Sequence, residues 1–246
     1  MSYDKYKVIG ISGKLNAGKD TVASMINYIH KIGVNNATYA EWLIRKNSFD
    51  ETYKDRIVHY ADNLKDIISI LYSIPRHLLD DRDFKDKLYY CINNNSFYHD
   101  YDIKDKKYII TIDDLEAINL KAYIDTYPVV YIKLRTLLQY IGTNICRNKL
   151  SNDIWIRNTR NKYTNIAMNT GICIIPDVRF KNEADAITTL KVPYVGCIIK
   201  VKRDDKLTSH ESEVIDFTSA YTIENYGTKV NLFYNVLSIY QKICKR

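Results

Sequence analysis

The stretch KVIGIS at residues 7–12 runs directly into GKLNAGKDT at residues 13–21, and these two pieces decide the fold. KVIGIS is a short apolar run, which is typical of a buried parallel strand. From Lys19 onward, apolar residues recur at helical spacing until Gly33, which stands where a helix C-cap would lie. We therefore predict a strand, a glycine-containing loop and a helix in direct succession.

The loop between them has the spacing of a phosphate-binding motif, with Gly13 followed by Gly18-Lys19. Two glycines let successive backbone N–H groups turn toward phosphate oxygens, and the start of the helix adds its positive dipole. Lys19 supplies a mobile positive charge for a phosphoryl group in transfer. The residues that we expect to bind ATP are Gly13, Asn16, Ala17, Gly18, Lys19, Asp20 and Thr21.

Asp20 departs from the common form of this motif, in which a Ser or Thr follows the lysine and contacts Mg²⁺. A carboxylate is a good ligand for a hard cation, and Thr21 offers a hydroxyl one residue later. We expect Asp20 and Thr21 to form the metal side of the site. The alternative is that Asp20 only favours the start of the helix through its charge.

The remaining pattern predicts an α/β fold with one parallel sheet covered by helices on both faces. It indicates one domain over residues 1–246, in which the charge-rich and less regular residues 81–128 form an insertion or lid rather than part of the sheet. Further strands are expected at residues 57–61, 172–177, 194–201 and 221–224. Further helices are expected up to about Ser73 before Pro75, and at residues 134–145, 182–190 and 230–244.

A second group of candidate residues follows the apolar strand ICIIPD at residues 172–177. Ligands of open α/β sheets bind outside the carboxyl ends of the strands, so Asp177 is placed to hold Mg²⁺ or to orient a phosphate acceptor. Arg179 can hold a phosphate through two hydrogen bonds. These two motifs make Lys19, Asp177 and Arg179 candidate catalytic residues, and the resemblance described below implies that Arg135 joins them.

Polar side chains also crowd the helix predicted at residues 134–145 and its end. Arg135 and Gln139 share a face of this helix, and they suit a monophosphate and its base, although a solvated helix face is the alternative. Trp155 could stack on a base or belong to the core. His210, Glu211 and Glu213 suggest either a metal or acid–base cluster or a charged surface turn. The other members of the helix group are Gly142, Thr143, Asn144 and Arg147.

Charge and cysteine content narrow the class of protein. The chain has 36 basic and 29 acidic residues, a net charge of +7, which favours an anionic partner. No basic block singles out nucleic acid. The five cysteines are scattered without a C-x-x-C pair, which argues against zinc and disulfides and favours a reduced, intracellular protein. Neither a signal peptide nor an apolar run of membrane-spanning length is apparent.

Taken in order, these pieces resemble the deoxynucleoside monophosphate kinases of bacteriophages and large DNA viruses, which are P-loop kinases. The resemblance covers nearly the whole chain except residues 81–128, and the order of its motifs is more specific than any one of them. The matching pieces are GKLNAGKDT (13–21), HYADNLKD (59–66), RTLLQYIGTNICR (135–147), Trp155, IIPDVRFKNEAD (174–185), SHESE (209–213) and, more weakly, TIEN (222–225).

The resemblance implies transfer of the ATP γ-phosphate to a deoxynucleoside monophosphate (dNMP) with Mg²⁺, giving dNDP and ADP, in the cytoplasm (of the host if viral). Lys19, Asp20 and Thr21 would hold the phosphates and the metal. His210 and Glu213 would belong to a loop of unclear role, and Leu15 and Asn16 differ from the more basic residues of some relatives. The acceptor and transition-state set would comprise Ala61, Asp62, Lys65, Arg135, Gln139, Gly142, Thr143, Asn144, Arg147, Trp155, Asp177, Val178, Arg179 and Glu183.

Two other functions fit parts of the same pattern. A small-metabolite phosphate kinase, such as the animal-type phosphomevalonate kinases, resembles the Lys-Asp loop and the strand-end Asp-x-Arg. A regulator that binds nucleotides or nucleic acid without catalysis is permitted by the net charge, whereas Lys19, Asp177 and Arg179 argue against it. We expect small nucleotides as partners, neither membrane nor specific nucleic acid, and a homodimer is compatible with the sequence.

Overall fold

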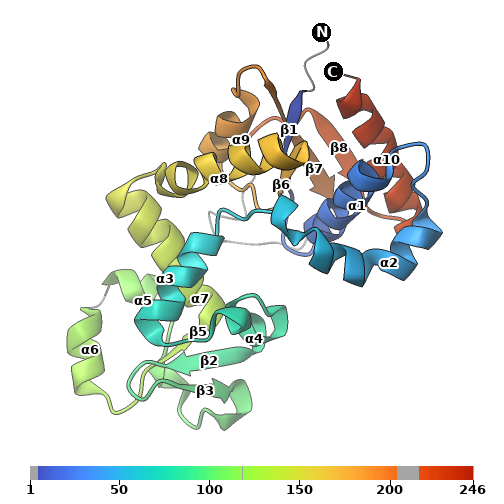
Figure 1. Cartoon of the computed structure of the whole chain (residues 1–246). Helices are drawn as coiled ribbons and strands as arrows, with labels where there is room; N and C mark the ends of the chain where they lie inside the picture. Colours follow the sequence, from blue (N-terminus) through green and yellow to red (C-terminus); the bar gives the residue numbers. More distant parts are fainter. Residues whose placement is uncertain (1–4, 118, 204–215, 246) are drawn as a thin grey trace. The chain divides into compact units, whose positions relative to one another are not determined.

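The computed structural model describes residues 5–117, 119–203 and 216–245 (Figure 1). The chain divides into two compact units. The phosphate-loop unit joins Met1–Tyr60 to Trp155–Arg246, and the middle unit is Ala61–Ile154. The sequence suggested one domain with an insertion at residues 81–128, whereas the middle unit extends beyond that insertion on both sides.

The phosphate-loop unit is built on a four-stranded sheet in which every strand is parallel to its neighbours, so the α/β class is confirmed. The strand order is β6 (Ile172–Ile175), β1 (Tyr6–Ser12), β7 (Tyr194–Lys202) and β8 (Tyr221–Glu224). The helices of this unit are α1 (Lys19–Ile32), α2 (Tyr39–Thr52), α8 (Ile154–Thr170), α9 (Lys181–Thr188) and α10 (Lys229–Cys244), together with the 3₁₀ turn η1 (Lys54–Arg56).

Helices cover both faces of this sheet because alternate residues of a strand point to opposite sides. Ile9 and Ile11 of β1 belong to the core shared with α1 and α10. Gly10 faces the other side, where α9 packs against β1 and β7 (Figure 1). The contact there is close, since a Cβ on Gly196 of β7 would lie 1.8 Å from the carbonyl oxygen of Ile187 in α9. Only glycine fits at this position.

The middle unit has a sheet of its own, and residues 81–128, which the sequence predicted as an insertion or lid outside the parallel sheet, contribute strands to this separate sheet. Its strands lie in the order β3 (Ser96–His99), β2 (Leu88–Cys91), β5 (Tyr131–Lys133), β4 (Ile109–Ile110). Only β4 and β5 pair in parallel; the other pairs are antiparallel. The helices are α3 (Asp62–Tyr72), α4 (Arg82–Lys87), α5 (Ile112–Ala117), α6 (Leu120–Thr126), α7 (Leu134–Gln139) and the π-helical η5 (Tyr140–Leu150), with 3₁₀ turns η2 (Arg76–Leu79), η3 (Asp100–Asp102) and η4 (Lys106–Tyr108).

Most predicted elements are found close to their expected bounds, and the differences concern residues 57–61 and the helix expected at residues 134–145. The strand expected at residues 57–61 is reduced to one bridge between Ile57 and Ile174, because the chain turns at Tyr60 to begin α3. The helix α3 ends at Tyr72, before Pro75, because Ser73 adopts a left-handed conformation (φ 53°). The helix expected at residues 134–145 is α7, which continues as η5 to Leu150.

A half-buried histidine makes the stability of the phosphate-loop unit depend on pH. The Nε2 atom of His30 lies 3.0 Å from the carbonyl oxygen of Thr170, and Nδ1 lies 2.6 Å from the hydroxyl of Tyr240. A carbonyl can only accept, so Nε2 carries the hydrogen and Nδ1 accepts from the hydroxyl of Tyr240. Burial lowers the pKa of His30 to about 4.

Acidification from pH 7 to pH 4 therefore destabilises the folded protein, because the unfolded chain takes up a proton on His30 near its ordinary pKa and the folded chain does not. The contribution is at most about 3 kcal/mol and is lost progressively as the pH falls below about 6.5. Denaturant unfolding across this range should show a shallower pH dependence in His30→Gln. The exposed His77 provides the control, and a His77→Gln slope as shallow as that of His30→Gln would contradict the assignment.

Candidate functional site

The loop after β1 is folded around its own lysine. The ammonium group of Lys19 donates to the carbonyl oxygens of Gly13 at 2.6 Å and Lys14 at 2.9 Å. The amide of Ala17 donates to the carbonyl oxygen of Lys14 at 3.1 Å, which closes a tight turn. The backbone of residues 13–19 therefore makes a tight turn directly before α1, and phosphate binding by this loop stays a prediction.

Gly18 is required here by its conformation and by its surroundings. Its φ of 98° lies in the left-handed region that glycine adopts without strain, and Asn16 is also left-handed at φ 65°. A Cβ on Gly18 would lie 2.7 Å from Nδ2 of Asn225. Gly18 is also the N-cap of α1, and no side chain in the described part of the chain caps this helix start. Helix amides without a side-chain cap are suited to an anion.

Asn225 holds the loop in place, and the sequence assigned it no role beyond the weak TIEN match. It follows β8 directly, and its backbone amide donates to the carbonyl oxygen of Lys202 at the end of β7, at 2.8 Å. Its side-chain Nδ2 donates to the carbonyl oxygen of Ala17 at 2.8 Å. The position just after a strand, at the edge that carries the phosphate loop, was the available signal.

Asn225→Asp should weaken ATP binding by about tenfold, because the carboxylate keeps the shape of the amide but cannot donate to Ala17 and repels its carbonyl. Titration with ATP at fixed acceptor concentration measures this as a rise in KM for ATP. Asn36→Asp changes an exposed asparagine of the same unit and is the matched control. Equal KM values for the Asn225 variant and the unaltered protein would remove the role given to this contact.

Asp177 and Arg179 lie at the same edge of the sheet as the phosphate loop. The strand β6 that leads to them pairs in parallel with β1, with Ile175 opposite Gly10, so both strands end at this edge. The amide of Val178 donates to the carbonyl oxygen of Ile11 at 3.2 Å, which fastens the turn to β1. One oxygen of Asp177 accepts from the amide of Tyr60 at 3.0 Å.

Glu183 fixes the turn that carries these two side chains. It is 2% exposed, and its Oε2 atom accepts from the amides of Arg179 at 2.9 Å and Phe180 at 3.1 Å. Buried carboxylates are costly unless hydrogen-bonded in this way. The structure therefore supports a positioning role for Glu183 at the start of α9, and its direct contact with a substrate stays a prediction.

The predicted metal side of the loop offers oxygen ligands at the first turn of α1. Asp20 is exposed and Thr21 is half-buried. Among the described residues, no group of three His, Cys, Asp or Glu side chains could hold a metal ion unaided. One carboxylate and one hydroxyl next to a phosphate site fit Mg²⁺, which is usually held by few protein oxygens together with substrate phosphates.

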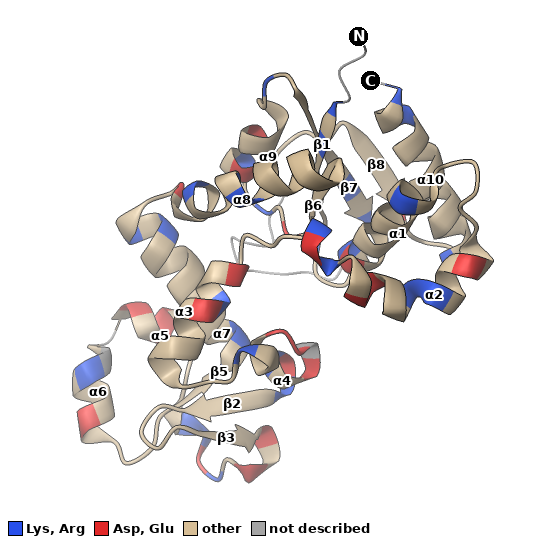
Figure 2. Cartoon of the chain, viewed as in Figure 1, with Lys and Arg blue, Asp and Glu red and all other residues tan. Residues whose placement is uncertain are grey.

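The acceptor candidates of the middle unit include several ion-paired side chains. Charged residues of both signs are found on α3 and α4, and α7 carries a basic residue (Figure 2). Arg135 of α7 pairs with Asp86 of α4. Lys65 of α3 pairs with Asp80 at 2.7 Å, and Asp62 pairs with Arg76 at 3.2 Å. Ala61 and Gln139, two further candidates in this unit, are partly exposed.

Several of the candidate residues at the end of the predicted helix 134–145 are buried, whereas Arg135 and Gln139 are partly exposed. Thr143 and Arg147 are each 5% exposed, and a Cβ on Gly142 would lie 2.6 Å from a methyl group of Leu64. Asn144 donates to Glu116 at 2.6 Å, and a nitrogen of Arg147 donates to Asn152 at 2.8 Å. Trp155, in α8, is 4% exposed, which favours its core role.

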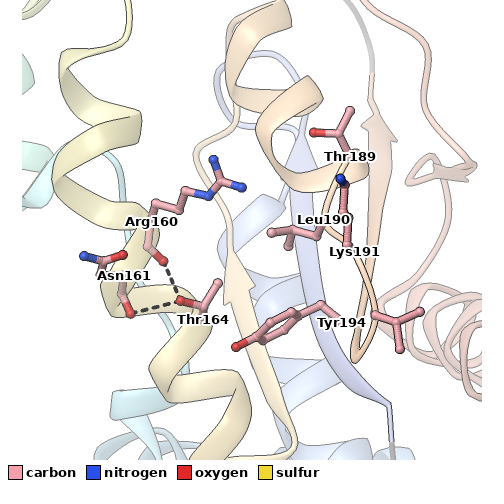
Figure 3. Close-up of a pocket in the computed structure, with 8 residues that line it drawn as sticks. Arg160, Asn161, Thr164, Thr189, Leu190, Lys191 and Tyr194 are labelled. Atoms are coloured by element: carbon pink, nitrogen blue, oxygen red, sulfur yellow. Dashed lines mark hydrogen bonds between the residues drawn. The ribbon is translucent and has the colours of Figure 1, made fainter.

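One pocket of the phosphate-loop unit lies away from the predicted residues. It has a volume of about 360 Å³ and lies between α8 and the segment that joins α9 to β7 (Figure 3). Tyr194, at the start of β7, lines it, so it is found near the amino ends of the strands rather than at the carboxyl edge that carries Gly13 and Asp177. The predicted residues His210, Glu211 and Glu213 lie outside the described residues.

A parallel sheet flanked by helices, with a phosphate-loop sequence between β1 and α1, is consistent with the P-loop nucleoside monophosphate kinase class of fold. A family model for deoxynucleotide monophosphate kinases matches residues 7–216, and the chain therefore belongs to the deoxynucleotide monophosphate kinase family. It is a nucleotide kinase, as the sequence resemblance implied. No curated protein matches the chain. None of the described helices is both long enough and apolar enough to cross a membrane.

Proposed function

We propose that the protein transfers the γ-phosphate of ATP to a deoxynucleoside monophosphate and releases ADP and dNDP. The observation that carries this proposal is the loop at residues 13–21, with left-handed Gly18 and Lys19 folded onto the loop carbonyls. Family membership supports a monophosphate as the acceptor.

On the donor side, the backbone amides around Gly13–Lys19 would bind the ATP phosphates. Lys19 already lies on this loop, and its ammonium would exchange the two carbonyl contacts for phosphate oxygens. Asp20 and Thr21 would hold Mg²⁺, which neutralises phosphate charge when bound. Asn225 and Gly18 keep the loop in shape during the exchange.

On the acceptor side, we assign the monophosphate to Arg135 and Arg179, with Asp177 orienting the acceptor. Support for this comes from the shared sheet edge of Asp177 and the phosphate loop, and from the two amides that Glu183 binds at residues 179 and 180. Phosphoryl transfer needs little covalent chemistry from a protein, so positioning and charge neutralisation supply the rate. The bond between the γ-phosphorus of ATP and the bridging oxygen of ADP breaks as a bond forms between that phosphorus and an oxygen of the monophosphate.

An ATP-consumption assay across dTMP, dGMP, dCMP, dAMP and the matching ribonucleotides tests the proposal. We expect ADP formation with one or more of the deoxynucleotides, at rates above those with the ribonucleotides. Phosphomevalonate is added to the panel as a non-nucleotide acceptor. Turnover with phosphomevalonate and with no nucleotide would assign the protein to the small-metabolite phosphate kinases instead. Salt-dependent nucleic-acid binding without ADP formation from any acceptor would favour a regulator.

We expect nucleotides to be the only small-molecule partners, without specific nucleic-acid binding. A cytoplasmic protein, monomeric or homodimeric, suits this reaction. A lid movement of residues 81–128 would suit it as well.

A further inference from the structure

Three cationic side chains come together in the middle unit, on three different elements. Lys65 lies on α3, Lys85 on α4 and Arg135 on α7. The helix α4 packs against α7 and η2, and α3 packs against η2 and α7, so the three elements form one packed group. Lys65 and Arg135 are among the predicted acceptor residues, whereas no sequence pattern selected Lys85.

Two of these three cations, Lys65 and Arg135, form ion pairs with carboxylates. Asp80 pairs with Lys65 and also with Arg76, and Asp86 pairs with Arg135. Lys85 has no ion pair with any carboxylate in the described part of the middle unit. Arg76 has two further partners, Asp62 and Asp66, so that among the described cations Lys65, Arg76, Lys85 and Arg135 it is Lys85 that lacks an ion pair. An ammonium that is partly removed from water without a paired carboxylate is a place where a bound anion is stabilised.

The surroundings of Lys85 disfavour the charged form of its ammonium group. Burial lowers the pKa of Lys85 to about 8, and the charges of Lys65 and Arg135 act in the same direction, against the opposing effects of Asp80 and Asp86. The other elements packed against α4 contribute further titratable or charged residues, namely Arg76 and His77 of η2, Tyr89, Tyr90 and Cys91 of β2, and Tyr131 and Lys133 of β5. A dianion near Lys85 would restore its pKa and its full charge.

From this arrangement we infer that Lys85 binds the phosphate group of the acceptor monophosphate together with Lys65 and Arg135. A nucleoside monophosphate carries close to two negative charges at neutral pH, which matches the unpaired ammonium and two cations whose carboxylates can be displaced. This inference rests on the proposed function, and it adds an acceptor residue that neither the phosphate-loop motif nor the strand-end motif contains.

Lys85→Met tests the role, because methionine keeps the half-buried stem and removes only the charge. We expect a rise of about tenfold to a hundredfold in KM for the dNMP that is turned over fastest, with KM for ATP unchanged. Lys87→Met is the matched control, since Lys87 lies two residues further on, is 63% exposed and pairs with Asp83 at the surface. An unchanged dNMP KM in the Lys85 variant overturns the inference while leaving the kinase assignment intact.

The pH profile supplies a readout that a purely structural role would not move. In the unaltered protein the ammonium is charged below its pKa of about 8, so KM for the dNMP should rise as the pH increases above that value. Lys85→Arg keeps its charge to higher pH and should remove this rise. A rise of the same size in Lys85→Arg contradicts the inference.

Calorimetric titration with the same dNMP, without ATP, separates the role of Lys85 from the proposed function itself. Weaker binding by Lys85→Met than by the unaltered protein and by Lys87→Met supports the inference, and equal binding overturns it. Absence of dNMP binding by the unaltered protein, together with absence of turnover, overturns both the inference and the proposed function.

Discussion

Lys19→Ala should lower kcat by about a thousandfold, with the fold and thermal stability nearly unchanged. The ammonium of Lys19 is the cation that we assign to the ATP phosphates, and it donates to the backbone carbonyls of Gly13 and Lys14. Its removal leaves the turn between Lys14 and Ala17 in place, because that turn is closed by a backbone hydrogen bond. Steady-state kinetics with saturating ATP and dNMP measure the loss.

Two control variants accompany this prediction. Lys19→Arg keeps the charge but changes its shape and reach, and should recover only part of the rate. Lys31→Ala removes an exposed lysine at the opposite end of α1 and should leave kcat unchanged. A Lys19→Ala protein with near-normal turnover would show that the loop is not the phosphate site.

Asp177→Asn should lower kcat by about a hundredfold while the protein remains as stable as the unaltered chain. The amide oxygen of asparagine can still accept from the amide of Tyr60, so the turn after β6 keeps its contact and only the negative charge is lost. Asp177→Ala loses the charge and the acceptor together, and should add about 1 kcal/mol of destabilisation to a similar loss of rate. Comparing kcat and denaturant unfolding for the pair separates chemistry from structure.

Asp185→Asn is the control for this pair, because Asp185 is an exposed carboxylate on α9 that pairs with Lys181 at the surface. It should change neither kcat nor stability by a measurable amount. If Asp177→Asn keeps full turnover, the carboxylate at the end of β6 serves only to anchor the amide of Tyr60.

The sequence predicted the parallel sheet and the site edge well because both rest on strong local patterns. The strands β1, β6 and β7 are near-continuous apolar runs, and the helices α1 and α10 have apolar faces that face the core. A parallel sheet then places the loops after all these strands at one edge. The order of strands and loops in the sequence was therefore enough to predict that Gly13 and Asp177 lie at the same edge of the sheet.

The helices α2 and α8 were missed because their sequences show the helical pattern weakly. In α2 only Trp42 and Phe49 are buried, and the remaining residues are mostly polar. In α8 the buried residues are separated by asparagine, arginine and lysine. Their helical state is determined by packing onto the rest of the unit, a tertiary effect that periodicity does not report.

The sheet of the middle unit was missed for a different reason. Its strands contain two to four residues each, too few to show a period of two, and β2 and β5 pair across a long interval of sequence. The surroundings of Asn225 and Lys85 were hidden in the same way. Asn225 donates to Ala17, far away in the sequence, and besides burial the charge of the distant residue Arg135 lowers the pKa of Lys85.

The most direct test of the central claim is to follow the γ-phosphate itself. The protein is incubated with Mg²⁺, with ATP radiolabelled in its γ-phosphate and with an unlabelled dNMP, and the products are separated. We expect label in the β-phosphate of the dNDP, in a time course that Lys19→Ala slows by about a thousandfold. Label released as inorganic phosphate, or retained in ATP with every dNMP, would contradict the proposed transfer.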